Sequence, residues 1–563
     1  MTRLHHLFPF LSWPRPDAAL LRGEAMAGLA VGLMVIPQGV AYAALAGMPL
    51  VTGIYASMLP ALLAVLFGSS VRLSVGPTAL SCLLVSASLS GLAEPGSARW
   101  VELAVWLALL SGLLQVALGF MRFGWLLNLV NAPVLMAFTQ AAALLIIGSQ
   151  LRDLLGISLG WSAWLRAPAL HWPSLAFGLV SLALLQLSRC WKPAFPSVLL
   201  IVLASAGLSW ALDFEAGGGH VIGALPEGLP ALYLPTLPEL STLSQLLLPT
   251  LIITLVSFLE TASSAKVDNE RQGTRWNQNQ DLIGQGLGKL AAGFSGAFPT
   301  SSSFSRSALN LYAGALTGWA TVFSVVVVFG ALLVFTPVLR HVPQSVLAAI
   351  VLVAVLGLVK PREFARLWRI SRVEAVIAGV TFAITLLAAP QLYWGVLAGV
   401  LMALSRFVFQ RLHPRIIEVG LHPDGSLRDR HLWKLPPLAA HTYALRMDEA
   451  LDFATAADFE RAIVEHLARH PDTEQVCLFA QPINHIDATG VDLFAKLVRQ
   501  LQARQITLHI SGIKLPVERA LRRAGCLQAS PRLALYRTDA EALSALQRQG
   551  RPADMPCEPW PVI

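Results

Sequence analysis

The chain has little charge and few cysteines. Only 13% of its 563 residues are Asp, Glu, Lys or Arg, about half the charged fraction of a typical soluble domain. Its five cysteines are odd in number and scattered, which suggests neither a disulfide framework nor a metal site. The apolar part shows no histidine spacing typical of metal ligands. We therefore expect no metal, no cofactor and no catalytic residues, and hence no enzyme.

The amino terminus lacks the pattern of a signal peptide, since residues 1–24 contain neither a continuous apolar core nor a small-residue cleavage site. What the chain has instead is 55% hydrophobic residues, gathered in long runs between 25 and 359, whereas 414–563 resembles an ordinary soluble sequence. Along the chain we predict a cytoplasmic segment 1–24, a transmembrane transport domain 25–413, a linker 414–435, a soluble domain 436–550 and a tail 551–563.

Apolar runs of about 17–25 residues, the length that spans a bilayer, predict an all-α membrane domain with fourteen segments. They are 25–46, 52–67, 77–91, 101–121, 124–148, 173–188, 195–212, 247–267, 279–296, 300–313, 316–336, 344–359, 373–388 and 392–411. Two of these, 77–91 and 300–313, are too short to cross alone.

Positive charge predicts the orientation of these segments, because Lys and Arg gather in cytoplasmic loops. With the amino terminus inside, the outer loops hold only Arg99, Arg152, Arg166 and Arg340. The inner loops hold Arg72, Arg122, Arg189, Lys192, Lys266, Arg271, Arg275, Lys360, Arg362, Arg366, Arg369 and Arg372. We therefore expect a plasma membrane, such as a bacterial inner membrane, with both termini cytoplasmic. The net charge of +8 then reflects topology, and we expect no nucleic-acid partner.

Two matched interruptions divide the membrane domain into halves. The 222 residues that separate Pro77 from Pro299 also separate Gln38 from Glu260, so a Pro-Thr pair follows each polar position after the same interval. This spacing indicates an internal repeat. Because seven spans is an odd number, the second half must have inverted orientation, and the short helices beginning near Thr78 and Thr300 should face one another with their amino ends.

Two facing helix starts in a membrane interior favour an anion site, because each offers unpaired backbone N–H groups and the positive end of a dipole. At the first start these belong to Thr78 and Ala79. The second start adds hydroxyl donors in Thr300, Ser301, Ser302, Ser303 and Ser305. The alternative is that Pro77 and Pro299 are simple kinks in packed helices.

Several motifs together resemble the SulP family of anion transporters over nearly the whole chain. They are VIPQGVAYA at 35–43, SVGPTA at 74–79, FLE at 258–260, NQDLI at 279–283 and FSRSALN at 304–310. The resemblance implies a 7+7 inverted repeat with two half helices and an elevator-like, alternating-access mechanism. Segments 1–4 and 8–11 would form a substrate-carrying core, and segments 5–7 and 12–14 a gate that contacts membrane lipid.

Glu260 is the predicted coupling residue, since an ionisable side chain in a membrane helix is costly and suggests function. Protonation would remove its repulsion of an incoming anion, so that proton and anion bind and move together as symport. In the family, Asp at this position is linked to sodium-coupled bicarbonate uptake, and Glu suggests proton coupling, so sodium is the less favoured coupling ion. The alternative is a structural ion pair of Glu260 with Arg306 or Lys289.

Four neighbours complete the predicted site. Ser264, on the same helical face as Glu260, would help bind the coupling ion or bond its own backbone. Gln38 and Tyr42 would contact the anion or be packing residues. Arg306, six positions after Thr300 and roughly 9 Å along the short helix, would attract the anion through its field, pair with Glu260, or extend toward the cytoplasm.

The soluble domain alternates strands and helices: strands near 442–447, 475–480 and 506–511, and helices near 455–469, from 490 to 503 and at 515–525. The segment IDATG at 486–490 resembles the STAS domain, whose soluble relatives carry a phosphorylatable serine where this chain has Ala488. Thr489 is a weaker candidate phosphosite, and either it or Asp487 would cap the next helix. By family analogy this small α/β domain organises a homodimer and tunes transport.

The substrate is an inorganic or small organic anion. Sulfate is favoured, because the second-half motifs resemble those of sulfate permeases. Bicarbonate and C4-dicarboxylates remain alternatives, since no paired arginines define a carboxylate fork, and so does anion exchange. A channel, which would also use helix dipoles and basic residues, is the remoter alternative.

Overall fold

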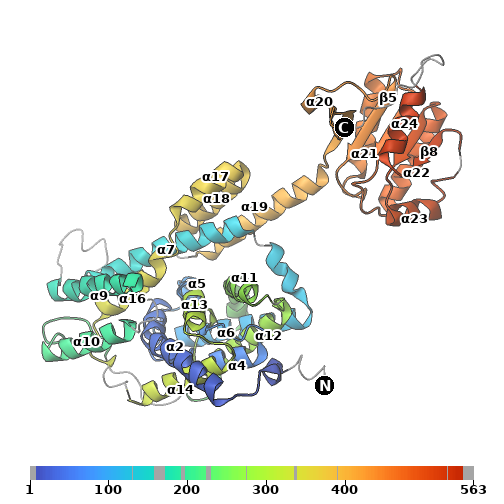
Figure 1. The fold of residues 1–563 in the computed structure, drawn as a ribbon. Coiled ribbons are helices and arrows are strands. Elements are labelled where there is room, and N and C mark those ends of the chain that lie inside the picture. The colour runs from blue at the N-terminus through green and yellow to red at the C-terminus, as the bar shows by residue number, and fades with distance from the viewer. Residues whose placement is uncertain are drawn as a thin grey trace. The chain divides into compact units, whose positions relative to one another are not determined.

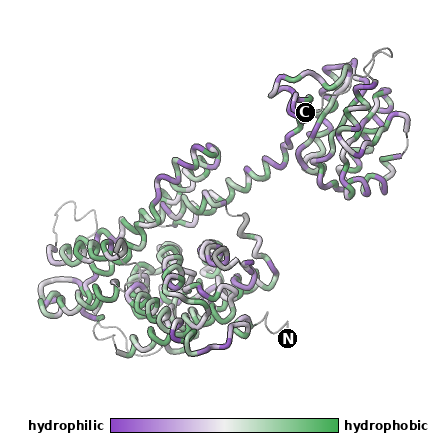
Figure 2. The backbone as a smooth tube through the Cα atoms, in the orientation of Figure 1, coloured by the Kyte–Doolittle hydropathy of each residue, from purple (hydrophilic) through white to green (hydrophobic). Residues whose placement is uncertain are grey.

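The computed structural model describes residues 8–129, 131–157, 171–191, 197–223, 230–273, 275–334, 339–389, 391–528 and 530–549. It divides into two compact units, Met1–Ala403 and Leu404–Ile563. Hydrophobic residues run along the helices of the first unit and alternate with hydrophilic ones in the second (Figure 2). The predicted tail, 551–563, lies outside the described residues.

The first unit is helical, and each of the fourteen predicted segments overlaps a helix in it (Figure 1). The first half contains α2 (Ala18–Leu45), α3 (Thr52–Tyr55), α4 (Leu59–Phe67), α5 (Ala79–Leu89), α6 (Ala98–Phe120), α7 (Ala132–Leu154), α9 (Trp172–Trp191) and α10 (Ser197–Ala211), with 3-10 turns η1 (Pro9–Ser12) and η2 (Phe123–Leu129). The second half contains α11 (Leu240–Gln272), α12 (Gln278–Phe294), α13 (Phe304–Tyr312), α14 (Trp319–Val334), α16 (Gln344–Leu356), α17 (Pro361–Ile370), α18 (Arg372–Leu387) and α19 (Tyr393–Leu412). Among the described residues, six helices are long and apolar enough to cross a membrane, and further apolar helices are shorter.

The helices form two packed groups. In the core bundle, α12 packs on α4 and α6, α2 packs on α14, and α5, α11 and α13 complete the group. In the gate bundle, α7 packs on α16 and α18, and α9 packs on α16 and α10. In the repeat, α7 corresponds to α16 and α9 corresponds to α18. The contact of α7 with α18 therefore corresponds to the contact of α16 with α9, as an internal repeat requires. The two bundles meet where α2 and α5 contact α16, α10 and α7.

The two short helices begin side by side. β1 (Val75–Gly76) and β2 (Ser301–Ser302) pair antiparallel, with Val75 opposite Ser302 and Gly76 opposite Ser301. Each strand leads into a short helix, α5 or α13. The second helix begins at Phe304, so the predicted start near Thr300 is wrong by about one turn. The reason is that Ser301 and Ser302 are extended and hydrogen-bonded to the first half.

Close packing of α2 on α14 depends on glycine and on one carboxylate. A side chain at Gly28 would place its Cβ 2.5 Å from the carbonyl oxygen of Ala320. Glu24, 1% exposed, accepts from the backbone N–H groups of Leu316, Thr317 and Ala320 at 2.8–2.9 Å. These donors lie at the start of α14 and lack intrahelical acceptors, so Glu24 caps α14 from a neighbouring helix.

The second unit is a six-stranded sheet of order β4-β3-β5-β6-β7-β8, with β5 to β8 parallel and β3 and β4 antiparallel at one edge. The strands are β3 (Ile416–Leu421), β4 (Leu427–Asp429), β5 (Thr442–Met447), β6 (Gln475–Phe479), β7 (Thr507–Ser511) and β8 (Leu533–Tyr536). The helices are α20 (Arg430–Trp433), α21 (Ala456–Arg469), α22 (Ala488–Ala503), α23 (Leu515–Arg523) and α24 (Asp539–Gln549). The predicted strands and helices are confirmed. Residues 414–435, predicted as a linker, instead contain β3, β4 and α20, because β3 completes the sheet beside β5.

The Glu24 cap provides a test of the core bundle. We expect Glu24→Ala to lower the free energy of unfolding by at least about 2 kcal/mol, because three N–H donors, two of them buried, lose their acceptor. A thermal melt of the purified protein in detergent measures the effect. Glu215→Gln, at an exposed position, is the control, and an unchanged melting temperature for Glu24→Ala would contradict the assignment.

Candidate functional site

A cavity of about 610 Å³ lies between the core and gate bundles at the starts of α5 and α13. Its core side is formed by α2, α5, α11 and α13, and its gate side by Leu135 and Thr139 of α7 and the end of α16. The residues with polar side chains around it are Tyr42, Thr78, Thr139, Glu260, Ser263, Ser302, Ser303, Ser305 and Tyr312. The starts of both half helices therefore reach one cavity, as the sequence predicts.

Each half helix has a hydroxyl cap at its start. Thr78 caps α5 and accepts from the N–H of Ser81 at 3.2 Å, and Ser303 caps α13 and accepts from the N–H of Arg306 at 3.5 Å. Ser303 also donates its backbone N–H to the carbonyl of Ser74 at 2.9 Å, which links the halves. The remaining N–H groups of the first turns, such as that of Ala79, have no intrahelical acceptor and are available to an anion.

Arg306 is a buried cation, 1% exposed, beside these starts. Its Nε donates to Ser74 Oγ at 3.3 Å and its Nη1 to Gln38 Oε1 at 3.5 Å, whereas its Nη2 has no hydrogen-bond partner. Among the described residues no carboxylate lies within 4 Å of the guanidinium. Arg306 is the third residue of α13, so the predicted distance of six positions from the helix start is wrong, because α13 begins at Phe304.

Glu260 lies on α11 and its half-buried side chain reaches the cavity. Its carboxylate accepts from Thr78 Oγ at 3.1 Å and from Ser81 Oγ at 3.4 Å. Neither Arg306 nor Lys289 forms an ion pair with it within 4 Å in the described part of the chain. The carboxylate is thus held by two hydroxyls of α5, which can donate to its ionised form or accept from its protonated form.

Five of the predicted site residues do not line the cavity. Gln38 turns its amide oxygen to Arg306 and so acts through it. Ser301 donates to the carbonyl of Ser257 at 3.3 Å. The hydroxyls of Thr300 and Ser264 are buried without a hydrogen-bond partner. Arg306 itself lies behind the cavity wall, in keeping with a role through its field.

Other residues at the cavity were not predicted. Ser263 follows Glu260 by three positions, so helical spacing could have indicated it, and its hydroxyl bonds the carbonyl of Leu259 at 2.9 Å. Ser81, which holds Glu260, follows Thr78 at the same spacing. Thr139 and Leu135 come from the gate bundle, and no local signal in the sequence connects them with the half helices.

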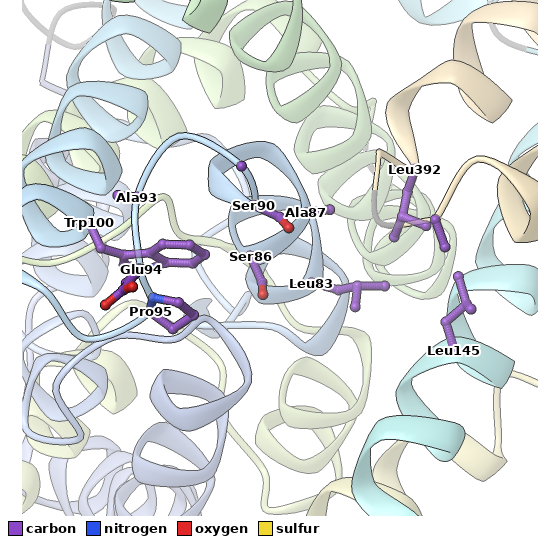
Figure 3. A pocket seen from close by; sticks show the side chains of 12 residues that line it. Leu83, Ser86, Ala87, Ser90, Ala93, Glu94, Pro95, Trp100, Leu145 and Leu392 are labelled. Atoms are coloured by element: carbon purple, nitrogen blue, oxygen red, sulfur yellow. The ribbon is translucent and has the colours of Figure 1, made fainter. Parts of the chain in front are cut away.

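A second pocket, of about 440 Å³, lies at the opposite end of α5. Figure 3 shows Trp100, Glu94 and Pro95 on one side of this region and Leu145 and Leu392 on the other, with Ser86 and Leu83 between them. The two pockets have no lining residue in common: Leu80 borders the first and Leu83 the second. About one turn of α5 therefore separates them.

The sulfate permease family model matches residues 21–381, and the STAS domain model matches 438–542. The chain belongs to the sulfate permease family. It is 31% identical over 554 residues to the chloroplastic sulfate transporter 4.1 of Arabidopsis thaliana, covering 93% of this chain and 80% of the relative. It is also 31% identical over 541 residues to a probable sulfate transporter of Mycobacterium tuberculosis, covering 94% and 96%.

Solved structures share the fold at 20% identity. The inward-facing structure of the murine Slc26a9 anion transporter aligns with a TM-score of 0.87 over 97% of this chain and 95% of that one. The transmembrane domain of the cyanobacterial bicarbonate transporter BicA aligns with a TM-score of 0.58 over 69% and 98%. The chain is therefore a multi-pass membrane protein of an anion transporter family, with a carboxy-terminal STAS domain, and not an enzyme.

In the STAS domain, Asp487 is the cap of α22: its carboxylate accepts from the N–H groups of Gly490 at 2.8 Å and Phe453 at 3.0 Å. Thr489 is exposed in the first turn of the same helix. Of the two residues predicted to cap this helix, Asp487 does so. Phosphorylation of Thr489 stays a prediction.

Arg306 provides a test of the anion site. We expect Arg306→Gln to weaken sulfate binding at least about tenfold, because a buried cation beside two helix starts then loses its charge. The stabilisation of the purified protein by added sulfate, followed in thermal melts, measures the change. Arg340→Gln, at an exposed position, should leave it unaltered. Equal stabilisation of Arg306→Gln and the wild type would rule out a role of this cation.

Proposed function

We propose that the protein takes up sulfate together with protons by an elevator-like, alternating-access mechanism. The observation that carries the proposal is the convergence of two helix starts, a buried cation and a carboxyl group on one cavity. Helix starts and Arg306 favour the anion. Glu260 adds a group that can gain and lose a proton, and its carboxylate lies 3.1 Å from the hydroxyl of Thr78 at the start of α5.

Coupling follows from the position of Glu260. Its carboxylate accepts from Thr78, whose backbone starts the first half helix. An ionised carboxylate there repels an arriving oxyanion through a poorly solvated gap, and a protonated one does not. The anion and the proton therefore favour each other's binding, and by linkage the effect is reciprocal. A gradient of protons would then drive accumulation of the anion.

Alternating access is supported by the separation of the two pockets. The cavity with the candidate site ends at Leu80, and the pocket of Figure 3 begins at Leu83. In the predicted orientation the candidate-site cavity lies toward the cytoplasm and the pocket of Figure 3 toward the outside. Movement of the core bundle along the gate bundle would close one of these two pockets and open the other. The apolar side chains of Leu83, Leu145 and Leu392 provide a surface for such sliding.

Sulfate is the proposed substrate because the relatives from Arabidopsis thaliana and Mycobacterium tuberculosis, each 31% identical over 93% or 94% of this chain, carry sulfate transport in their names. Backbone N–H groups from two directions and hydroxyls such as Ser302 and Ser303 suit a tetrahedral oxyanion, which accepts on all sides. We also propose a homodimer in a bacterial inner membrane with both termini cytoplasmic. Sodium is the less favoured coupling ion, since the family resemblance links sodium coupling to Asp at the position where this chain has Glu260.

Glu260→Gln tests the coupling. We expect wild-type proteoliposomes to take up labelled sulfate faster when the outside is acidified, and to accumulate it against its gradient. In Glu260→Gln the amide cannot titrate, so the pH gradient should no longer drive accumulation, whereas exchange of sulfate across the membrane should persist. Glu239→Gln, the same change at an exposed position just before α11, is the matched control. Concentrative, pH-driven uptake by Glu260→Gln would disprove the coupling.

A competition panel tests the substrate. Excess bicarbonate or succinate should not compete with labelled sulfate, because neither presents four oxygens arranged tetrahedrally around one atom to the two helix starts. Unlabelled sulfate is the positive control. Absence of sulfate uptake by the wild type would refute the proposal, and strong competition by bicarbonate or succinate would replace sulfate with that anion.

A further inference from the structure

A second buried cation lies behind the site. Lys289 of α12 is 0% exposed and donates from Nζ to Ser257 Oγ. Ser257 precedes Glu260 by three residues on α11, so the ammonium group lies about one helical turn from the carboxylate. No carboxylate is within 4 Å of this ammonium among the residues described. A buried charge is costly in a membrane interior, and its presence there suggests a function.

The surroundings of Lys289 leave Glu260 as its main charged neighbour. The buried face of α4 carries no charge, and the charged residues of α6, Arg99 and Glu102, are the second and fifth residues of that helix. On α12 itself, Asp281 is two turns away and accepts from the backbone of Ser69 and Ser70 and from Trp276. Besides Lys289, the neutral side chain of Gln115 donates to the Ser257 hydroxyl, at 3.0 Å.

Counting only the three charged groups nearest the half-helix starts, Glu260, Lys289 and Arg306, gives a different balance for each anion. The other buried charges of the core bundle are held elsewhere: Arg72 pairs with Asp268, and Glu24 and Asp281 accept from backbone N–H groups. Lys289 and Arg306 contribute two positive charges, and Glu260 one negative charge when ionised. A divalent oxyanion bound with protonated Glu260 leaves no net charge. A monovalent anion bound in the same state leaves one positive charge. With Lys289 removed, the divalent anion leaves one negative charge and the monovalent anion leaves none.

We propose that Lys289 determines the valence of the transported anion, by supplying the second buried positive charge that a divalent oxyanion neutralises. This inference rests on the proposed function and adds the substrate class to it: doubly charged tetrahedral oxyanions. Lys289 acts through its field, because Ser257 and Ser301 separate it from the cavity: Ser301 Oγ donates to the Ser257 carbonyl. At an effective dielectric of about 20, a unit charge roughly 10 Å away changes the binding of another unit charge by about tenfold.

The test compares anions of one shape and different charge. Sulfate and perchlorate are both tetrahedral, and selenate is a second divalent control. Dissociation constants are measured by titration calorimetry on the purified full-length protein, at the acidic pH that favours uptake. In Lys289→Met we expect the preference for sulfate over perchlorate to fall at least about tenfold, and Lys289→Arg should retain most of it.

A merely structural role for Lys289 would weaken all three anions equally and leave this ratio unchanged, which would overturn the proposal. Should Lys289→Met fail to fold, the pair Glu260→Gln and Lys289→Met/Glu260→Gln replaces it, since the double variant removes both buried charges. The ratio must fall between these two proteins, and equal ratios would also overturn the proposal. Failure of the proposed function is a separate result, namely wild-type protein without sulfate uptake or without its dependence on the pH gradient.

Discussion

A helix that begins inside a membrane exposes backbone N–H groups where no water can reach them, and the transport domain is arranged around two such helices. The segments before α5 and α13 satisfy each other by antiparallel pairing of β1 with β2. This pairing brings the halves of the chain together at their breaks. The N–H groups that remain after the pairing and the two hydroxyl caps are those of the first helical turns, and they meet at the cavity.

The same constraint explains how the charged residues are held. Arg306 and Glu260 both come from the second half, and the groups that bind them come from the first: Gln38 and Ser74 for the cation, Thr78 and Ser81 for the carboxylate. Neither charge is cancelled by the other within 4 Å among the described residues. The site therefore keeps a cation for an anion and a carboxyl for a proton, instead of losing both to an internal ion pair.

Periodicity and spacing could predict the helices and the two breaks, because long apolar runs and prolines leave strong local signals. The start of α13 was misjudged since Thr300 to Ser303 suit both an extended segment and a helix cap, and only the partner strand β1 decides between them. For the same reason the sequence predicts a linker where β3 lies, because the pairing of β3 with β5 joins segments far apart in the chain. The gate residues Leu135 and Thr139 could not be found, because they reach the site only through packing of α7.

The repeat is symmetric in its backbone and asymmetric in its charges. Glu260, Lys289 and Arg306 all lie in the second half, and 222 residues earlier stand Gln38, Phe67 and Leu84, none of which is ionisable. Two facing helix starts alone would bind an anion whatever the pH. In the proposed function a single carboxyl group on one side makes that binding depend on one proton, and in the further proposal Lys289 and Arg306 set the charge that the anion must bring. Both proposals thus place coupling and preference in the residues that break the symmetry of the repeat.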